Sequence, residues 1–270
     1  MEEALLRISK QLDEKRYGKY RAFVVDTADP EKRGRVRLRI PSVLGDAESS
    51  WALPCVPFAG GSGYGWFAVP PLDSQLWVEF EEGDINRPIW VGAFWQVSDD
   101  VPENAAQDEP TVFLLQTPAG NRLELNDTEG EEALTLFHPS EAQLQIDSNG
   151  SCAVTDANGS KLVLDASNNE CVIEDSNGNK LVMSSSGTKV EDASGNSIEM
   201  ASSGITVSGQ QIVIEGSQVS LGGQGGEPLI KGTSFLTLFA THIHPTAMGP
   251  SGPPIPQGEM SSLSTTVLTS

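Results

Sequence analysis

Two histidines near the end of the chain, His242 and His244, have the type and spacing of metal ligands. On an extended strand, residues two positions apart have side chains on the same side. Histidine is a common metal ligand near neutral pH, but two imidazoles alone hold a transition-metal ion weakly. Three chains around one axis would bring six imidazoles together, an octahedral shell suited to iron, nickel or zinc. Metal binding and trimerisation would then stabilise each other.

Catalytic chemistry is not indicated elsewhere in the sequence. There is no convincing Ser-His-Asp order, and none of the three cysteines has a histidine neighbour. His138 follows Phe137 and precedes Pro139, has no second ligand near it in sequence, and is assigned no role. The carboxylates recur at regular outward positions, where solvation accounts for them. We therefore expect a protein without enzymatic activity.

The segment that would position the histidine pair is a repeat of short strands between glycine turns, covering residues 117–225. Its marking glycines recur at intervals of about nine residues or twice that, and are Gly150, Gly159, Gly178, Gly187, Gly195 and Gly204. Repetition at a fixed period indicates stacked structural units. Each unit is predicted to be one short strand and one turn.

Alternation within these strands predicts two unlike faces, because successive side chains of a strand point to opposite sides. One face is apolar and contains Leu123, Leu125, Leu162, Leu164, Cys171, Ile173, Leu181, Met183, Ile212 and Ile214. The other is charged and contains Arg122, Glu124, Lys161, Glu170, Glu174, Lys180 and Glu215.

Two apolar residues per strand give one chain too little interior to offset a backbone ordering cost of roughly 1–2 kcal/mol per residue. Three chains that wind about one axis would seal the apolar faces and leave no open edge. We therefore expect an intertwined trimeric β-helix over residues 117–225. A calcium-binding nonapeptide solenoid would need Gly-Gly-x-Gly-x-Asp turns, which are absent. A single-chain parallel β-helix uses longer coils, and is the less favoured alternative.

Charge is distributed unevenly along the 270 residues. Residues 1–95 hold 12 basic and 14 acidic side chains, a net charge of −2, which leaves −18 of the total −20 for residues 96–270. Such acidity argues against nucleic acid as a partner, and would keep rods soluble and apart.

The start of the chain, Met1-Glu2-Glu3-Ala4-Leu5-Leu6, has acidic residues where a secretory signal needs basic ones. No apolar run approaches the roughly 20 residues of a membrane-spanning helix. We expect synthesis in the host cytoplasm with no signal peptide. The odd cysteine number suits free thiols, and Cys152 and Cys171 fall on the apolar parity of the repeats.

The sequence that precedes the repeats predicts a different fold. Leu5, Ile8 and Leu12 have helical spacing, which indicates an amphipathic helix within residues 1–16. Five strands between turns predict a small Greek-key barrel over residues 17–95, namely Tyr20–Thr27, Gly34–Ile40, Trp51–Val56, Gln75–Phe80 and Pro88–Ala93. A polar linker (96–116) leads to the repeats, and a tip region with a C-terminal tail (226–270) ends the chain.

Several short sequence motifs of the barrel segment resemble those of a known family. They are Gly34-Arg-Val-Arg-Leu-Arg-Ile-Pro41, Trp51-Ala-Leu-Pro54, Gly63-Tyr-Gly-Trp-Phe-Ala-Val-Pro70, Leu76-Trp-Val-Glu-Phe80 and Glu82-Gly-Asp-Ile-Asn-Arg-Pro-Ile-Trp-Val-Gly92. In this order they resemble the oligonucleotide/oligosaccharide-binding (OB) domain of the phage baseplate assembly protein V family. That family supplies the central spike of contractile tails and is related to the valine-glycine repeat spikes of type VI secretion.

The resemblance implies an all-β protein in which an OB-fold barrel is followed by a trimeric β-helix. It implies a structural spike that attaches to a baseplate hub and pierces the target cell envelope when the sheath contracts. Its place would be a virion tail baseplate or an extracellular injection particle. His242 and His244 match a His-x-His pair that binds iron near the tip of some family members, one ion per trimer. Here, however, Gly249 to Ser270 follow the pair.

Two alternatives to the structural spike stay open. One is a tail-associated enzyme that degrades glycan or peptidoglycan, which would need an aromatic-lined groove and paired carboxylates. Only residues 96–116 separate barrel and repeats, too few for the lysozyme domain that some family members insert there. The other is a spike that carries a separate tip or effector protein at residues 250–270.

The barrel's own chemistry is a strand of four arginines, Arg33, Arg35, Arg37 and Arg39, which alternate with Val36, Leu38 and Ile40. The alternation predicts that the arginines share one face. Single-stranded nucleic acid needs stacking aromatics beside the basic residues, and this strand has none. We expect a docking surface for a hub protein or an adjoining protomer, and neither nucleic acid nor a small-molecule substrate as a ligand.

Overall fold

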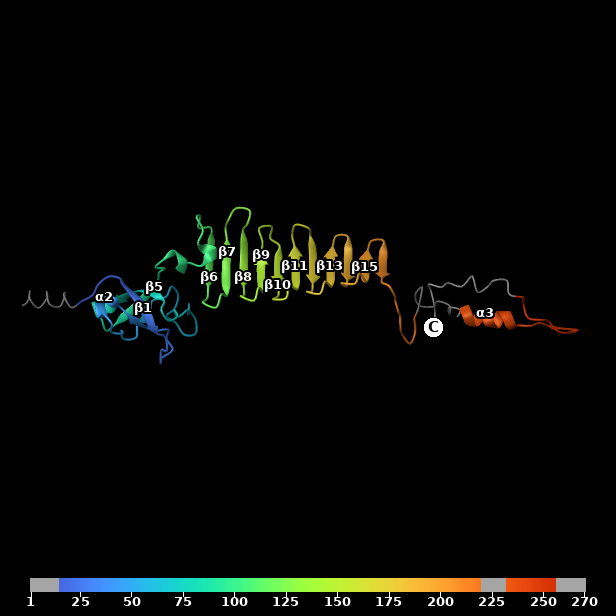
Figure 1. Ribbon diagram of the computed structural model, residues 1–270, viewed down its shortest axis with the longest axis horizontal. Coiled ribbons are helices and arrows are strands. Elements are labelled where there is room, and N and C mark those ends of the chain that lie inside the picture. The colour runs from blue at the N-terminus through green and yellow to red at the C-terminus, as the bar shows by residue number, and fades with distance from the viewer. Residues whose placement is uncertain (1–14, 220–231, 256–270) are drawn as a thin grey trace, which may run out of the picture. The chain divides into compact units, whose positions relative to one another are not determined.

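The computed structural model describes residues 15–219 and 232–255 (Figure 1). The helix expected within residues 1–16 lies almost wholly outside this range, and so does the tail beyond residue 255. The chain divides into two units, Met1–Ser208 and Gly209–Ser270, which are described separately. None of the described helices has the length and apolar character needed to cross a membrane.

The first unit begins with a small five-stranded sheet. Its strands are β1 (Tyr20–Asp26), β2 (Arg37–Arg39), β3 (Leu53–Pro54), β4 (Gln75–Phe80) and β5 (Pro88–Ala93). Their order in the sheet is β2-β1-β4-β5-β3. All neighbours are antiparallel except β3 and β5, which run parallel. The expected strands of the barrel are therefore present, although β2 and β3 are shorter than predicted.

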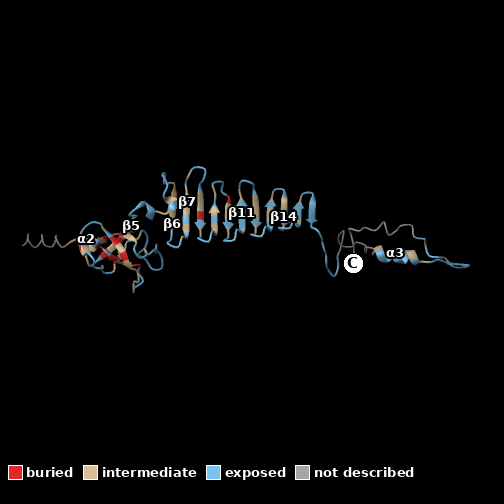
Figure 2. Ribbon diagram, viewed as in Figure 1, coloured by how far each residue is buried: buried red, intermediate tan, exposed pale blue. Residues whose placement is uncertain are grey.

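The main core of the described chain lies in this barrel (Figure 2). Alternate residues of the strands point inward and are fully buried, among them Ala22, Val24, Val36, Leu38, Ile40, Ala52, Leu76 and Val78. A short helix that the sequence analysis did not predict, α2 (Pro41–Leu44), follows β2 and has proline at its start. Proline is tolerated in the first helical turn, where its missing N–H would have no intrahelical partner.

Residues between barrel and repeats form two 3-10 turns, η2 (Ser98–Asp100) and η3 (Glu103–Ala105). The Gln75 side chain donates a hydrogen bond to Asp100 Oδ2 over 3.2 Å. The Asn104 amide donates to Glu124 Oε2 over 2.9 Å. The linker is thus bonded to the barrel near one end and to the repeats near the other.

The repeats form one eleven-stranded antiparallel sheet in sequence order. Its strands are β6 (Val112–Gln116), β7 (Arg122–Asn126), β8 (Ala133–Phe137), β9 (Gln143–Ile146), β10 (Cys152–Thr155), β11 (Lys161–Asp165), β12 (Glu170–Glu174), β13 (Lys180–Ser184), β14 (Gly187–Glu191), β15 (Ser197–Ala201) and β16 (Gly204–Ser208). Every strand pairs with its neighbours in sequence. The repeats were expected to wind between three chains; within this one chain, short turns connect consecutive strands as hairpins.

Aspartates organise four of these turns in the same way. Asp175 Oδ1 accepts the backbone N–H groups of Asn177 and Asn179 at 2.9 and 2.8 Å, and Gly178 adopts a φ of 92° that favours glycine. Equivalent bonds to the residues two and four positions on are made by Asp147, Asp156 and Asp192. Aspartate favours such turns because its side chain bonds the backbone two residues on.

Turns on the same edge of the sheet are also bonded to each other. Ser160 Oγ accepts the backbone N–H of Ser176 at 3.2 Å, and Asn179 Oδ1 accepts that of Ala193 at 3.3 Å. On the opposite edge, Ser151 Oγ accepts the N–H of Ala166 at 3.1 Å. The residue after a turn glycine therefore satisfies a backbone donor of the next turn along that edge.

The second unit contains α3 (Gly232–Thr241) and a small hairpin of β17 (Pro245–Thr246) and β18 (Gly249–Pro250). Residues 209–219 form no strand. The prediction that Ile212 and Ile214 continue the strand pattern is therefore wrong for the single chain. Their alternation suits a strand, but in the described residues no neighbouring strand pairs with them.

Candidate functional site

One face of the eleven-stranded sheet carries two continuous rows of apolar side chains. The first row is Leu115, Leu123, Leu136, Leu144, Val154, Leu162, Ile173, Leu181, Val190, Ile198 and Val207. The second is Phe113, Leu125, Leu134, Ile146, Cys152, Leu164, Cys171, Met183, Thr188, Met200 and Ile205. We call this surface the apolar face. Thr188 is the one polar member of the two rows.

The apolar face is largely exposed in the single chain, and the ribbon of the sheet is mostly in the exposed and intermediate colours in Figure 2. Leu164 is 51% exposed, Ile173 47% and Ile205 70%. Exposed apolar patches larger than a few hundred Å² usually mark an interaction site. The two free thiols that the sequence assigned to this parity, Cys152 and Cys171, do lie in the second row, separated by Leu164.

The opposite face is less uniformly charged than predicted. Val163 lies opposite Val172, and Val172 opposite Val182, so that valines occupy its middle row from β11 to β13. Charged residues flank them, with Glu174 Oε2 at 3.4 Å from Lys161 Nζ and 3.8 Å from Lys180 Nζ. The signal was present in the sequence, since valine stands between the two apolar-face residues of each of these strands.

The histidine pair lies between α3 and β17 instead of on a strand as expected. The two rings are nevertheless adjacent, with centroids 5.0 Å apart and planes nearly perpendicular. The Nδ1 of His242 contacts the backbone carbonyl of Phe239, which can only accept, so this nitrogen carries the proton and Nε2 is left to bind a ligand. The backbone N–H of His244 donates to Ser251 Oγ over 2.8 Å.

This arrangement fits two imidazole ligands and supplies no third. Among the described residues, no cluster of three or more His, Cys, Asp or Glu side chains could hold a metal ion. His138 is remote in sequence from the pair, and its Nδ1 accepts the backbone N–H of Ser140 at 3.1 Å in a turn. A metal at His242 and His244 would therefore need ligands from other chains.

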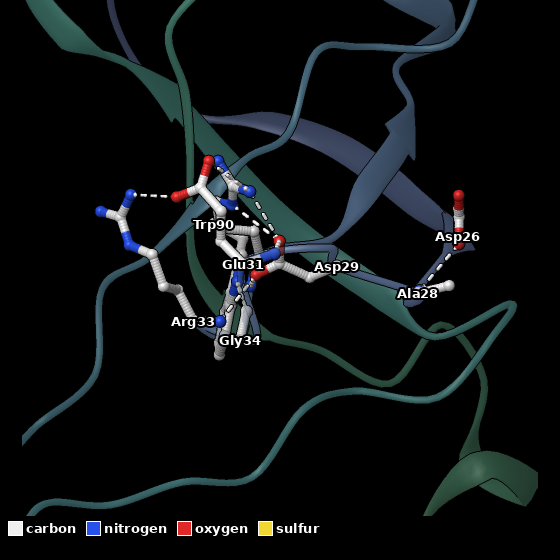
Figure 3. Close-up of polar contacts among 8 residues, drawn as sticks. Asp26, Ala28, Asp29, Glu31, Arg33, Gly34 and Trp90 are labelled. Carbon is white, nitrogen blue, oxygen red and sulfur yellow. Dashed lines mark hydrogen bonds and ion pairs between the residues drawn. The ribbon is translucent and has the colours of Figure 1, made fainter. Parts of the chain in front are cut away.

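The arginine strand of the barrel lies as the alternation predicted, with Val36, Leu38 and Ile40 buried and the arginines outward. Asp29 organises its start (Figure 3). This carboxylate accepts the Arg35 side chain and the backbone N–H groups of Glu31 and Arg33. The Arg35 hydrogen bond is the main reason why the pKa of Asp29 lies well below its usual range.

Aromatic residues of neighbouring segments lie beside these arginines, which the strand's own sequence did not reveal. The guanidinium carbons of Arg35 and Arg37 lie 5.8 and 5.4 Å from the Trp51 ring centroid, and that of Arg39 lies 4.6 Å from Phe23. Trp90 donates a 3.2 Å hydrogen bond from Nε1 to the carbonyl of Gly34 (Figure 3). Only strand pairing, which brings distant residues together, discloses these contacts.

The barrel defines the class of protein. Residues 20–95 match the family described as the type VI secretion system/phage-baseplate injector OB domain, which covers the whole five-stranded sheet. The barrel segment is therefore an OB domain of the phage-baseplate and type VI secretion kind, as the sequence resemblance predicted.

Two curated relatives agree with this assignment. The type VI secretion system spike protein VgrG4b of Pseudomonas aeruginosa is 31% identical over 112 residues, which are 38% of this chain and 14% of that protein. The actin cross-linking toxin VgrG1 of Vibrio cholerae is 29% identical over 114 residues, 39% of this chain and 10% of that protein. The chain thus spans about a seventh or less of the length of these relatives.

A solved structure of the G-box domain of the microcephaly protein CPAP also aligns with 37% of this chain and 99% of its own. Its sequence identity is 10% and its TM-score is 0.13. A likeness this low supports no conclusion about fold or function.

Proposed function

We propose that this chain is a structural central spike of a contractile injection machine, a phage tail baseplate or a phage-derived particle. The spike attaches to the hub through its barrel and pierces the target cell envelope when the sheath contracts. It would therefore reside in a virion tail baseplate or an extracellular injection particle. The observation that carries the proposal is an injector OB domain followed by a long sheet whose apolar face is left uncovered.

The apolar face supports assembly as a homotrimer. Its two rows run across all eleven strands with Thr188 as their one polar member, so they would be buried along their whole length if three sheets packed face inward around one axis. Burial of apolar surface contributes about 25 cal/mol per Å². The flanking Lys161, Glu174 and Lys180 of the opposite face would remain in water, where charged side chains are stable.

The far end of the sheet supports the same assembly. Among the described strands, β16 is an edge strand that pairs with β15 only. Residues 211–215, beyond β16, have strand-like alternation and no strand partner in the described chain. Unpaired edges tend to recruit strands of other chains. We infer that the three copies interwind at residues 211–215, as was expected for the whole repeat.

The histidine pair supports a metal ion on the trimer axis. Three copies would contribute the Nε2 atoms of His242 and His244, six imidazole ligands in all. Iron is the expected ion, with zinc or nickel as alternatives. Such an ion would supply no reaction, and would hold three chain ends together.

The proposal assigns mechanical work and no catalysis to this chain. The candidate surfaces are an apolar face, a histidine pair and the arginine strand, none of which is a groove with paired carboxylates and aromatics. A spike that also carries a separate tip or effector protein is the second candidate. It would bind beyond residue 250, largely outside the described residues.

Light scattering of the purified full chain tests the trimer. The expected mass is three times the 28.8 kDa of the chain, with the trimer persisting in cold detergent. A monomer over the whole measured concentration range would refute the spike. Elemental analysis tests the metal, and should find about one ion per three chains. The double substitution His242→Ala and His244→Ala should remove the ion and keep the trimer.

A further inference from the structure

The contact of Arg39 with Phe23 is part of a larger group of arginines and aromatic rings on the outer surface of the barrel sheet. We call Arg21, Phe23, Arg39, Trp77 and Phe94 the arginine–aromatic face. Phe23 lies directly opposite Arg39 across β1 and β2, and Arg21 directly opposite Trp77 across β1 and β4. Directly paired residues of antiparallel strands share one face. The alternate residues of β1 are buried in the core, so this face points outward.

Each of the two arginines is held against aromatic rings. The guanidinium carbon of Arg39 lies 4.6 Å from the Phe23 ring centroid. That of Arg21 lies 5.7 Å from the Trp77 ring and 5.4 Å from the Phe94 ring, and these two rings are 4.7 Å apart. A guanidinium stacked on a ring keeps its edge N–H groups free to bond a carboxylate.

Arg21 and Arg39 lack the charge partners that most other arginines and lysines of the barrel have. Five basic side chains there form ion pairs with carboxylates at distances of 2.6–3.2 Å, namely Lys19, Arg33, Arg35, Arg37 and Arg87. Within the described residues, Arg21 and Arg39 have no carboxylate within 4 Å. The two exposed cations of the arginine–aromatic face are thus left without an ion pair in a chain whose net charge is −20.

The complementary charges lie in the linker. Glu103, Asp108 and Glu109 are exposed, and none of them has an ion pair in the described part of the chain. The linker also starts beside the arginine–aromatic face. Gln75, which lies directly opposite Phe23, bonds Asp100 at 3.2 Å. From there the same chain continues through η3 to the repeats, and its acidic residues do not contact Arg21 or Arg39.

We propose that the arginine–aromatic face of each barrel binds the acidic linker segment, residues 103–109, of a second copy of this chain. The inference rests on the trimer of the proposed function. A head-to-tail contact of this kind closes when it is repeated around a threefold axis. Diagonal neighbours across paired strands are about 7–8 Å apart, a spacing that lets the two guanidiniums bind two carboxylates of one segment.

Nucleic acid is the less suitable occupant. Single strands bind by stacking their bases on open aromatic faces, whereas Phe23, Trp77 and Phe94 already have guanidiniums over them. The acidic repeats would also repel phosphates. A carboxylate segment needs only the guanidinium edges, which remain available.

Zero-length carbodiimide coupling tests the contact in the full chain. The variant Arg39→Lys places a primary amine on the face, and the reagent joins it to a carboxylate it touches, forming an amide as the carbodiimide takes up water. The expected product is a covalent dimer or trimer whose amide links position 39 to Glu103, Asp108 or Glu109, identified by peptide mass spectrometry. The wild type sets the background.

Two further variants define the outcome. Arg87→Lys is the matched control, because Arg87 lies 2.6 Å from Glu81 and should couple within one chain. Adding Glu103→Gln, Asp108→Asn and Glu109→Gln to Arg39→Lys should abolish the interchain product. Coupling of position 39 only within its own chain, or to no carboxylate, overturns the inference.

The mass of the protein before coupling distinguishes a failure of this inference from a failure of the proposed function on which it rests. A trimer without the interchain amide refutes the linker contact alone, and a monomer refutes both. Binding of an oligothymidine by the wild type, lost in the variant Arg21→Gln with Arg39→Gln, would identify nucleic acid as the occupant and would also overturn the proposal.

Discussion

Arg35 and Asp29 form the most enclosed ion pair of the described chain, with Nη2 and Oδ1 2.6 Å apart and side chains only 12% and 4% exposed. The same carboxylate accepts three backbone N–H groups of the loop between β1 and β2. Asp29 therefore determines both the path of this loop and the position of the first buried residue of the arginine strand, Val36.

Replacement of Asp29 should destabilise the barrel more than replacement of any exposed partner. Asp29→Asn keeps an oxygen for the backbone donors but removes the nearer and more enclosed of the two carboxylates that pair with Arg35, and leaves only the exposed Glu31 carboxylate at 3.1 Å. Glu48→Gln is the matched control, because Glu48 and Arg37 are about half exposed and such pairs contribute little. Urea denaturation monitored by tryptophan fluorescence should give a clearly lower midpoint for Asp29→Asn than for Glu48→Gln. Equal midpoints would contradict the assignment.

Gly187 should be the least replaceable glycine of the sheet. A Cβ there would lie 2.0 Å from the Met200 carbonyl oxygen of the paired strand, and its φ is 142°. Gly187→Ala must therefore separate β14 from β15 or strain the backbone, at a cost of about 1–3 kcal/mol or more. Gly195→Ala, with a φ of 85° and open space around the position, is the comparison and should cost less. Thermal unfolding by circular dichroism measures both.

Acid should weaken the turns of the sheet. Hydrogen bonds from Asn179 are the largest cause of the lowered pKa of Asp175, about 2 against 3.8 in an unfolded chain. The ionised carboxylate thus contributes stability at pH above about 4, and this contribution is lost as the pH falls towards 2. The denaturation midpoints of wild type and Asp175→Asn should differ at pH 6 and converge near pH 2. A difference that does not depend on pH would refute this role.

Leu164 and Val163 are neighbours in β11, and their side chains lie on opposite faces of the sheet. Leu164→Gln changes the apolar face, which is exposed in one chain, and should reduce or abolish the trimer because three polar groups would enter its interior. Val163→Gln changes the opposite face of the same strand and should leave the trimer intact. Sedimentation of both variants at equal concentration gives the comparison. Loss of the trimer with Val163→Gln alone would place the interface on the opposite face.

Side-chain alternation in the sequence predicted the strands of the barrel and the two parities of the repeats. It correctly placed Leu38 inside, Leu164 and Cys171 on one apolar face, and Arg37 outside. Alternation cannot specify a strand's partner, however, because hairpins and interchain coils present the same pattern along the chain. The pairing of β11 with β12 depends on the geometry of the turn at residues 166–169, which the pattern does not contain.

Other features depend on contacts between distant residues. The stacking of Arg39 on Phe23 follows from the register of β1 and β2, and no local signal predicts that register. α3 was missed because its apolar residues, such as Phe235 and Leu238, occur in a stretch of threonines that disfavour helices. There the hydroxyls of Thr237 and Thr241 bond the carbonyls of Thr233 and Thr237.

The hairpin order of the eleven-stranded sheet has a consequence for how such a protein can vary in length. Consecutive turns lie on alternate edges of the sheet. Removing one strand would therefore make the chain leave the sheet at the opposite edge and in the opposite direction. Removing or adding two strands would preserve both. Since neighbouring strands are about 4.8 Å apart, natural or engineered relatives should differ in reach by increments of roughly 10 Å.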